Sequence, residues 1–164
     1  MKSNREEKNQ EGAARLLRDD CDDMSGYFYV QSKLNQLVLT IEGFQGGKLA
    51  MYPPYGGANQ LWKWGPGDIL VSKMGLALGG NIDFLFQNPP FSLIASPPGS
   101  PITLNWQYEN DELEMTAPTT LVMDLLHGNT EVSAAVGLYE RNGHLNQKWI
   151  LLPETKLSEN KPKL

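Results

Sequence analysis

Between Tyr27 and Pro153 the apolar residues come in short runs, and turn-forming residues separate one run from the next. The pairs Gly-Gly, Pro-Pro and Asn-Gly stand in many of the gaps, and no segment has a sustained apolar period of 3.6 residues. Many short strands at regular spacing are typical of an all-β barrel or sandwich. The runs are 27–32, 37–41, 48–52, 60–64, 68–72, 76–80, 84–87, 91–96, 102–108, 113–117, 121–126, 134–139 and 147–152.

The two ends of the chain have a different composition. Residues 1–24 carry 12 charged residues and no aromatic one, and residues 154–164 carry five charged residues. Neither end can bury enough apolar surface to offset the entropy of ordering it, so we expect charged tails around a single domain, 25–153. Residues 5–18 predict a short helix that is marginal alone. The acidic residues around Cys21 favour a solvated run over a divalent-ion site.

A repeat organises the domain. Trp62, Trp106 and Trp149 are spaced 44 and 43 residues apart, and each closes a block that begins with two apolar strands. Four strands in each of three blocks predict twelve strands. A WD40-like propeller has a similar repeat length but needs about four or more blades to close, so a closed three-fold barrel fits better.

The ends of the blocks resemble a known signature. Gln60-Leu61-Trp62 and Gln147-Lys148-Trp149 match the Gln-x-Trp repeat of the ricin B-type lectin domain, and Leu104-Asn105-Trp106 keeps only the tryptophan. The resemblance covers about residues 27–153 and implies a β-trefoil with three pseudo-symmetric four-stranded repeats. It also implies that each Trp lies in the core and that the Gln amide mainly satisfies neighbouring polar groups.

The same resemblance implies a set of sugar-binding positions: an Asp after the second strand, an aromatic residue about fifteen positions later, and the Asn before Gln-x-Trp. The third block has all three, Asp124, Tyr139 and Asn146. A carboxylate accepts bonds from adjacent sugar hydroxyls, an aromatic ring covers the C–H face of a galactose-like ring, and an amide both donates and accepts. Gln147 and His127 complete the candidate carbohydrate-binding set. An ordinary turn carboxylate at Asp124 and a solvated His127 stay open as alternatives.

The other positions match the pattern less well. A family glutamine is replaced by Gly137 in the third block. The first block has Thr40, Tyr52 and Asn59, which predicts a weak second site or a lost one, because threonine cannot supply a carboxylate. The second block has Gly79 and Thr103 at the Asp and Asn positions, so we expect it to be structural.

Charge and cysteine content narrow the function classes. The net charge of -5 argues against a nucleic-acid binder or an anionic-membrane binder, since both need a basic face. The sequence has no run of 18 apolar residues, so no membrane span is predicted. The N-terminus lacks the apolar segment of a secretory signal. A single cysteine, Cys21, fits a reducing compartment. We therefore expect a cytoplasmic protein, with secretion by another route or excision from a longer chain left open.

Nothing in the sequence points to an enzyme. The chain has two histidines and one cysteine, no metal-ligand spacing, no P-loop and no nucleophile elbow, so we expect no catalytic residue, no metal and no cofactor. A paired-carboxylate glycosidase and a trefoil-type protease inhibitor have no identifiable motif here.

Two function classes remain. The first is a carbohydrate-binding lectin module for galactose or N-acetylgalactosamine-type glycans, with its main site in the third block. The alternative is a trefoil scaffold whose sugar sites are lost and whose loops, such as 53–57 and 88–91, bind a protein partner or a second copy of the chain.

Overall fold

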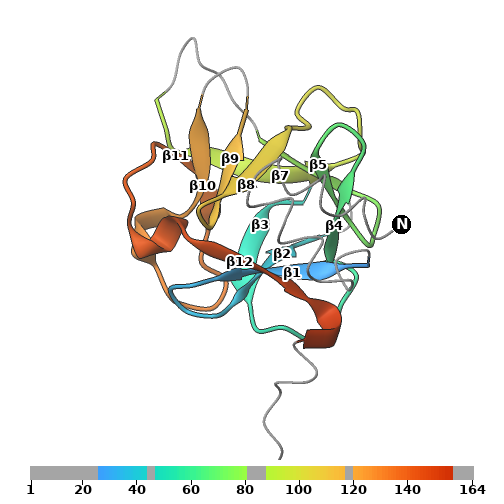
Figure 1. Cartoon of the computed structure of the whole chain (residues 1–164), viewed down its shortest axis with the longest axis horizontal. Helices are drawn as coiled ribbons and strands as arrows, with labels where there is room; N and C mark the ends of the chain where they lie inside the picture. The colour runs from blue at the N-terminus through green and yellow to red at the C-terminus, as the bar shows by residue number, and fades with distance from the viewer. Residues whose placement is uncertain (1–25, 44–46, 81–87, 117–119, 157–164) are drawn as a thin grey trace, which may run out of the picture.

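The computed structural model describes residues 26–43, 47–80, 88–116 and 120–156 (Figure 1). The predicted helix 5–18, the apolar run 84–87 and most of both tails lie outside these residues. Glu154 is described: its N–H donates to the carbonyl of Tyr27 at 3.2 Å, just beyond the predicted end of the domain.

The described residues contain twelve strands, the number that was predicted. In chain order they are β1 (Phe28–Ser32), β2 (Val38–Ile41), β3 (Leu49–Tyr52), β4 (Trp62–Gly65), β5 (Ile69–Ser72), β6 (Ala77–Gly80), β7 (Phe91–Ser96), β8 (Trp106–Glu109), β9 (Glu112–Met115), β10 (Leu121–Leu125), β11 (Val136–Tyr139) and β12 (Trp149–Pro153). Two single-turn 3-10 helices, η3 (Leu126–Gly128) and η4 (Leu145–Gln147), lie in the third repeat. In the part of the chain that the structure describes, no helix has the length and apolar character needed to span a bilayer.

The strand pairing divides the chain into three equivalent units. Each unit contributes one antiparallel hairpin, β2–β3, β6–β7 and β10–β11, and the remaining strands pair as β1–β12, β1–β4, β4–β5 and β8–β9. The first and last strands pair over five residues, from Phe28–Pro153 to Ser32–Trp149, so the two ends of the domain lie side by side (Figure 1). The three hairpins also touch one another, through the pairs Lys48–Ile94, Ala50–Ala135 and Gly137–Ser92.

The repeating tryptophans occupy equivalent places. Their side chains are between 0% and 1% exposed, and each indole N–H donates to a backbone carbonyl on the second strand of its own repeat. A buried indole N–H needs such an acceptor, because an unpaired one loses its bond to water without replacement. The three bonds are Trp62 to Leu39 (3.3 Å), Trp106 to Leu78 (3.3 Å) and Trp149 to Met123 (3.0 Å).

These bonds fix the places where a binding site can form. The accepting carbonyls belong to the residues just before Thr40, Gly79 and Asp124, which are the three predicted carboxylate positions. A second backbone bond recurs in each repeat, from the N–H of the residue after the first strand to the carbonyl of the residue before the Trp of the preceding repeat, the third repeat counting as the one before the first. The three pairs are Lys33 to Lys148 (3.0 Å), Lys73 to Leu61 (2.8 Å) and Thr116 to Asn105 (3.2 Å).

Successive side chains of β10 point alternately into the hydrophobic core and toward the face that carries the site. Leu121, Met123 and Leu125 point into the main hydrophobic cluster, so Val122 and Asp124 point to the opposite face of the strand. The position after Met123, whose carbonyl receives the Trp149 bond, therefore presents its side chain away from the core.

Replacing one of the tryptophans tests their role in folding. We expect Trp106→Ala to lower the free energy of unfolding by about 3–5 kcal/mol, as large core truncations do. Trp106→Phe should cost clearly less, because most of the buried ring volume remains. Urea unfolding followed by circular dichroism measures both, with the half-exposed Val132→Ala as a surface control. A loss below about 1 kcal/mol for Trp106→Ala would contradict the assigned role.

Candidate functional site

The β10–β11 hairpin of the third repeat positions the predicted sugar-binding residues. Asp124 pairs with Gly137 and Val122 pairs with Tyr139, so the aspartate and the tyrosine lie on the same face, two register positions apart. Asp124 is therefore a strand residue of β10. The alternative reading of Asp124 as an ordinary turn carboxylate is wrong, because the hairpin register continues through it to Leu125.

The Asp124 carboxylate is held by the end of the same repeat. Asn146 donates from Nδ2 to Oδ1 at 3.1 Å, and Gln147 donates from Nε2 to Oδ2 at 2.8 Å. Asp124 is only 2% exposed. Each carboxylate oxygen has a second lone pair, so two acceptor positions remain after these bonds are made.

Burial raises the pKa of Asp124 above its ordinary value of 3.8. The hydrogen bonds from Gln147 and Asn146 oppose this shift, and so do the neighbouring imidazoles of His127 and His144. The carboxylate is thus held in a less polar environment than that of a surface aspartate, where a hydrogen bond from a ligand gains strength.

Gln147 has a structural role in this arrangement. It is fully buried, its Nε2 also donates to the carbonyl of Glu140 at 2.8 Å, and its Oε1 accepts from the N–H of Asn142 at 2.9 Å. It does not line the cleft that contains Asp124. The structure therefore corrects its inclusion among the ligand-binding candidates, because all of its polar atoms serve to hold Asp124 and the loop after β11.

Asn146 is placed differently. Its Nδ2 also donates to the carbonyl of Leu125 at 3.1 Å, which uses both of its N–H groups. No residue in the described part of the chain donates to its Oδ1. Asn146 is partly exposed and lines the cleft, so its side-chain oxygen is available to a ligand hydroxyl.

An open cleft of about 570 Å³ lies over these residues. Asp124 and Asn146 line it together with Tyr139, which is 37% exposed, and both histidines of the chain, His127 and His144. His127 has a left-handed backbone conformation, with φ 61°, which is uncommon for a residue with a side chain. The remaining lining residues are Leu34, Pro90, Leu126, Gly128, Asn142 and Leu145.

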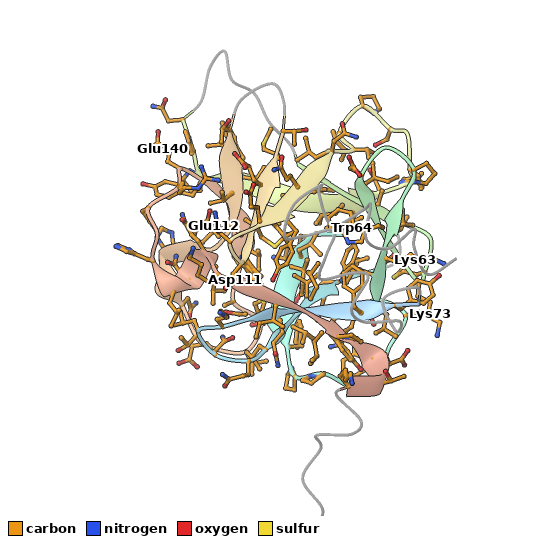
Figure 2. The ribbon with its side chains drawn as sticks, viewed as in Figure 1. Lys63, Trp64, Lys73, Asp111, Glu112 and Glu140 are labelled. Atoms are coloured by element: carbon orange, nitrogen blue, oxygen red, sulfur yellow. The ribbon has the colours of Figure 1, made fainter. Side chains whose placement is uncertain are left out.

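Ion pairs support the segment that carries the cleft. The buried carboxylate of Glu112, on β9, accepts from Arg141 Nε at 2.7 Å and from Lys148 Nζ at 3.2 Å. Arg141 also pairs with Glu114 at 3.2 Å. Glu112, Asp111 and Glu140 lie at this side of the molecule (Figure 2). These pairs fasten both ends of the 141–148 loop to β9, and the sequence analysis did not anticipate them.

The equivalent positions of the first repeat have internal partners. Gln60 Nε2 donates to Thr40 Oγ1 at 3.2 Å, which reproduces the Gln147–Asp124 bond with a hydroxyl in place of the carboxylate. Asn59 Nδ2 donates to the carbonyl of Ile41 at 3.1 Å and bonds the Tyr55 hydroxyl at 2.9 Å. The Tyr52 hydroxyl donates to the Glu42 carboxylate. Thr40, Tyr52 and Asn59 are thus near one another in the fold, but their polar groups are engaged.

The second repeat has no room for a site. Gly79, at the carboxylate position, forms a backbone bridge with Thr103. A Cβ atom at Gly79 would lie 1.9 Å from the carbonyl oxygen of Ile102, so no side chain fits there. The same bridge explains why strand β8 begins only at Trp106, whereas the apolar run predicted a strand from residue 102.

Solved structures share this arrangement. The C-terminal half of the earthworm R-type lectin, solved with GalNAc, superposes with a TM-score of 0.63 at 24% identity, over 79% of this chain and 99% of that one. The fold is a β-trefoil. The Rhizoctonia solani agglutinin matches the trefoil with a TM-score of 0.61 at 25% identity, over 79% of this chain and 95% of that one. A designed three-fold symmetric protein, ThreeFoil, matches with a TM-score of 0.63 at 22% identity, over 77% and 98%.

No protein-family model and no curated protein sequence matches the chain. The trefoil is therefore recognised from its three-dimensional arrangement. The fold class predicted from the repeat is confirmed by these structural neighbours. Among the described residues of the trefoil, no cluster of three or more metal-ligating side chains occurs.

Several residues of the trefoil site were not anticipated. His144 and Leu145 line the cleft from the loop before Gln147, and Leu34 reaches it from the turn after β1. In the first repeat Glu42 and Tyr55 engage the residues that were expected to bind sugar. Aligning the first block with the third, position by position, places Glu42 opposite Leu126, so the sequence alone could have drawn attention to Glu42. The contacts of Tyr55 could not be found in this way, because they depend on the geometry of its loop.

Stability measurements test the structural part of the Asp124 network. Asp124→Ala leaves one N–H of the buried Gln147 without an acceptor, so we expect a loss of about 1–3 kcal/mol in the free energy of unfolding. Asp124→Thr introduces the residue that accepts from Gln60 in the first repeat and should cost clearly less. Equal losses for both variants in urea unfolding would show that the Gln147 bond does not stabilise the fold.

Proposed function

We propose that the protein is a carbohydrate-binding lectin module whose main site is the cleft of the third repeat, and that it binds galactose or N-acetylgalactosamine-type glycans. The observation that carries the proposal is the convergence of Asp124, Tyr139 and Asn146 on one open cleft, with acceptor atoms still available. The equivalent groups of the first and second repeats are engaged or absent.

Each of the three residues has a distinct task. The remaining lone pairs of the Asp124 carboxylate accept from two adjacent sugar hydroxyls, and these charge-assisted bonds are the strong ones. Asn146 Oδ1 accepts from a third hydroxyl. Tyr139 offers its ring to the apolar C–H face of the sugar, which in galactose is uninterrupted because the 4-hydroxyl points to the other side.

The structural neighbours support a galactose-type ligand. The earthworm lectin was solved with GalNAc, the Macrolepiota procera ricin B-like lectin with lactose, and the Vibrio vulnificus trefoil lectin with N-acetyl-D-lactosamine. The M. procera protein matches at 21% identity with a TM-score of 0.63, over 76% of this chain and 93% of that one. All three ligands contain galactose or its 2-acetamido derivative.

The cleft also supports a binding role over a catalytic one. Asp124 is the one carboxylate among the described residues that line it. Glycosidases normally need two carboxylates facing the scissile bond. We therefore propose that the protein binds its glycan without hydrolysing it. Because the cleft is open, one sugar displaces water but buries little area, so useful avidity requires several sites on one assembly.

The decisive experiment compares wild type with Asp124→Thr on a glycan array and in titrations with galactose and N-acetylgalactosamine. We expect wild type to bind galactose-terminated glycans and Asp124→Thr to lose at least about 90% of the signal. The variant keeps the acceptor for Gln147, so the loss reports the carboxylate and not unfolding, which circular dichroism confirms.

An array on which wild type binds no glycan would contradict the lectin proposal. The trefoil scaffold would then be the better account, and the loop 53–57 would be its candidate contact surface. Tyr55 in that loop is 63% exposed, the largest exposed fraction among the large apolar residues that the structure describes.

Binding should also depend on pH with a definite sign. Protonation of Asp124 removes the acceptor charge, so affinity falls as the pH falls. Because burial raises the pKa of Asp124, the midpoint of this loss should lie above 3.8, the ordinary value for an aspartate. Titrations with galactose from pH 7 to pH 3.5, each with a circular dichroism check of folding, measure the midpoint. An affinity that stays constant down to pH 3.8 would contradict the assigned role of the carboxylate.

A further inference from the structure

The cleft of the third repeat is lined by leucines as well as by polar residues. Leu126 continues the hairpin pairing through a bond from its N–H to the carbonyl of Ala135, the residue just before β11, at 3.1 Å. It therefore continues the face of β10 that carries Asp124, and it lies on the opposite side of the carboxylate from Tyr139, which pairs with Val122. A ligand held by Asp124 thus has the tyrosine on one side and a leucine on the other.

Leu126 lies over the glycine that faces Asp124 across the hairpin. A Cβ atom at Gly137 would be 3.0 Å from Leu126 Cδ1 and 3.3 Å from Cδ2, and 2.5 Å from the carbonyl oxygen of Phe91. A side chain at position 137 is therefore excluded, and the leucine covers the position. Position 137 therefore contributes no polar side chain to the cleft, and the apolar side chain of Leu126 lies over it.

Two more leucines extend this surface. Leu145, at the start of η4, is 51% exposed although it is a large apolar residue, and Leu34 lies in the turn after β1. Both line the same cleft as Leu126. Three leucines from three separate segments therefore line the cleft together with its polar residues. This is more apolar surface than a bare sugar ring, with hydroxyls over most of its edge, can cover.

The fold does not require Leu126 and Leu145, whereas Leu34 also packs against the main hydrophobic cluster. In the first repeat Thr40 stands where Asp124 stands and Asn59 where Asn146 stands, because Gln60 and Gln147 make the same bonds. By this alignment Leu126 corresponds to Glu42, and Leu145 corresponds to Ala58. The equivalent surface of the first repeat is thus polar and small, in an equally complete trefoil unit.

From this arrangement we propose that Leu34, Leu126 and Leu145 form an apolar subsite that binds the aglycone of a galactoside, an alkyl or aryl group attached through the glycosidic oxygen. The inference rests on the proposed function, since it places the sugar ring at Asp124. The cleft of about 570 Å³ falls in the range of roughly 300–1,000 Å³ that is typical of pockets for drug-sized ligands, which are larger than one sugar. The methyl of an acetamido group is too small to cover three leucines.

The test compares three ligands that share one sugar: methyl, hexyl and phenyl β-galactoside. Burying several methylene groups or a ring removes enough apolar area from water to raise affinity by about tenfold. We expect wild type to bind the hexyl or the phenyl galactoside about tenfold more tightly than the methyl galactoside. The hexyl and phenyl arms distinguish a lipid-like chain from an aromatic aglycone.

Two matched variants locate the effect. Leu145→Asn should bring the ratio of hexyl or phenyl to methyl affinity close to one. Val132→Asn, at a residue that is 52% exposed and outside the cleft, should leave the wild-type ratio unchanged. A ratio that falls equally in both variants would overturn the assignment to Leu145.

The remaining outcomes separate this inference from the proposed function. Equal wild-type affinities for the three galactosides overturn the apolar subsite and leave the lectin proposal standing. The apolar subsite is also overturned, and the lectin proposal stands, if methyl N-acetylgalactosaminide alone binds more tightly than methyl galactoside. The apolar contact is then to the acetyl group and not to an aglycone. No binding of any galactoside, including the methyl one, overturns both proposals.

Discussion

The fold depends on one hydrogen bond made three times, from a buried indole N–H to a backbone carbonyl within the second strand of its repeat. Each bond joins the last strand of a unit to its second strand, so it ties the unit together across its middle hairpin. The bond also decides where a ligand can bind. The next residue, Thr40, Gly79 or Asp124, must present its side chain away from the core.

The three repeats differ in the residue that stands at this position and in the groups that bond to it. In the third repeat a carboxylate is held by Asn146 and Gln147, and half of its acceptor capacity remains for a ligand. In the first repeat a hydroxyl fills the same place and its neighbours bond one another. In the second repeat the backbone itself fills the place, which only a glycine permits. The same trefoil fold thus leaves acceptor atoms free for a ligand at the third repeat, whereas the equivalent positions of the first and second repeats are filled.

The fold and half of the site were predictable from the sequence, for the reason that both follow the repeat. Tryptophans at fixed spacing can be equivalent only in a symmetric arrangement, and Asp124, Tyr139 and Asn146 then fall together by register. The hydrogen bonds of Gln147 agree with the expectation that its amide satisfies neighbouring polar groups, and only its inclusion among the binding candidates is corrected. The turn reading of Asp124 was wrong, because a turn pattern does not reveal where a strand ends. Leu34 and Glu112 could not be predicted, since they reach the site from segments distant in sequence.

The central claim is that a galactose-type sugar binds in the third-repeat cleft, at Asp124. A galactose titration followed by amide NMR chemical shifts tests it most directly. We predict saturable shifts at Asp124, Tyr139 and Asn146, with none at Thr40 or Gly79. Shifts confined to the first repeat, or no saturable shift at any residue, would contradict the account.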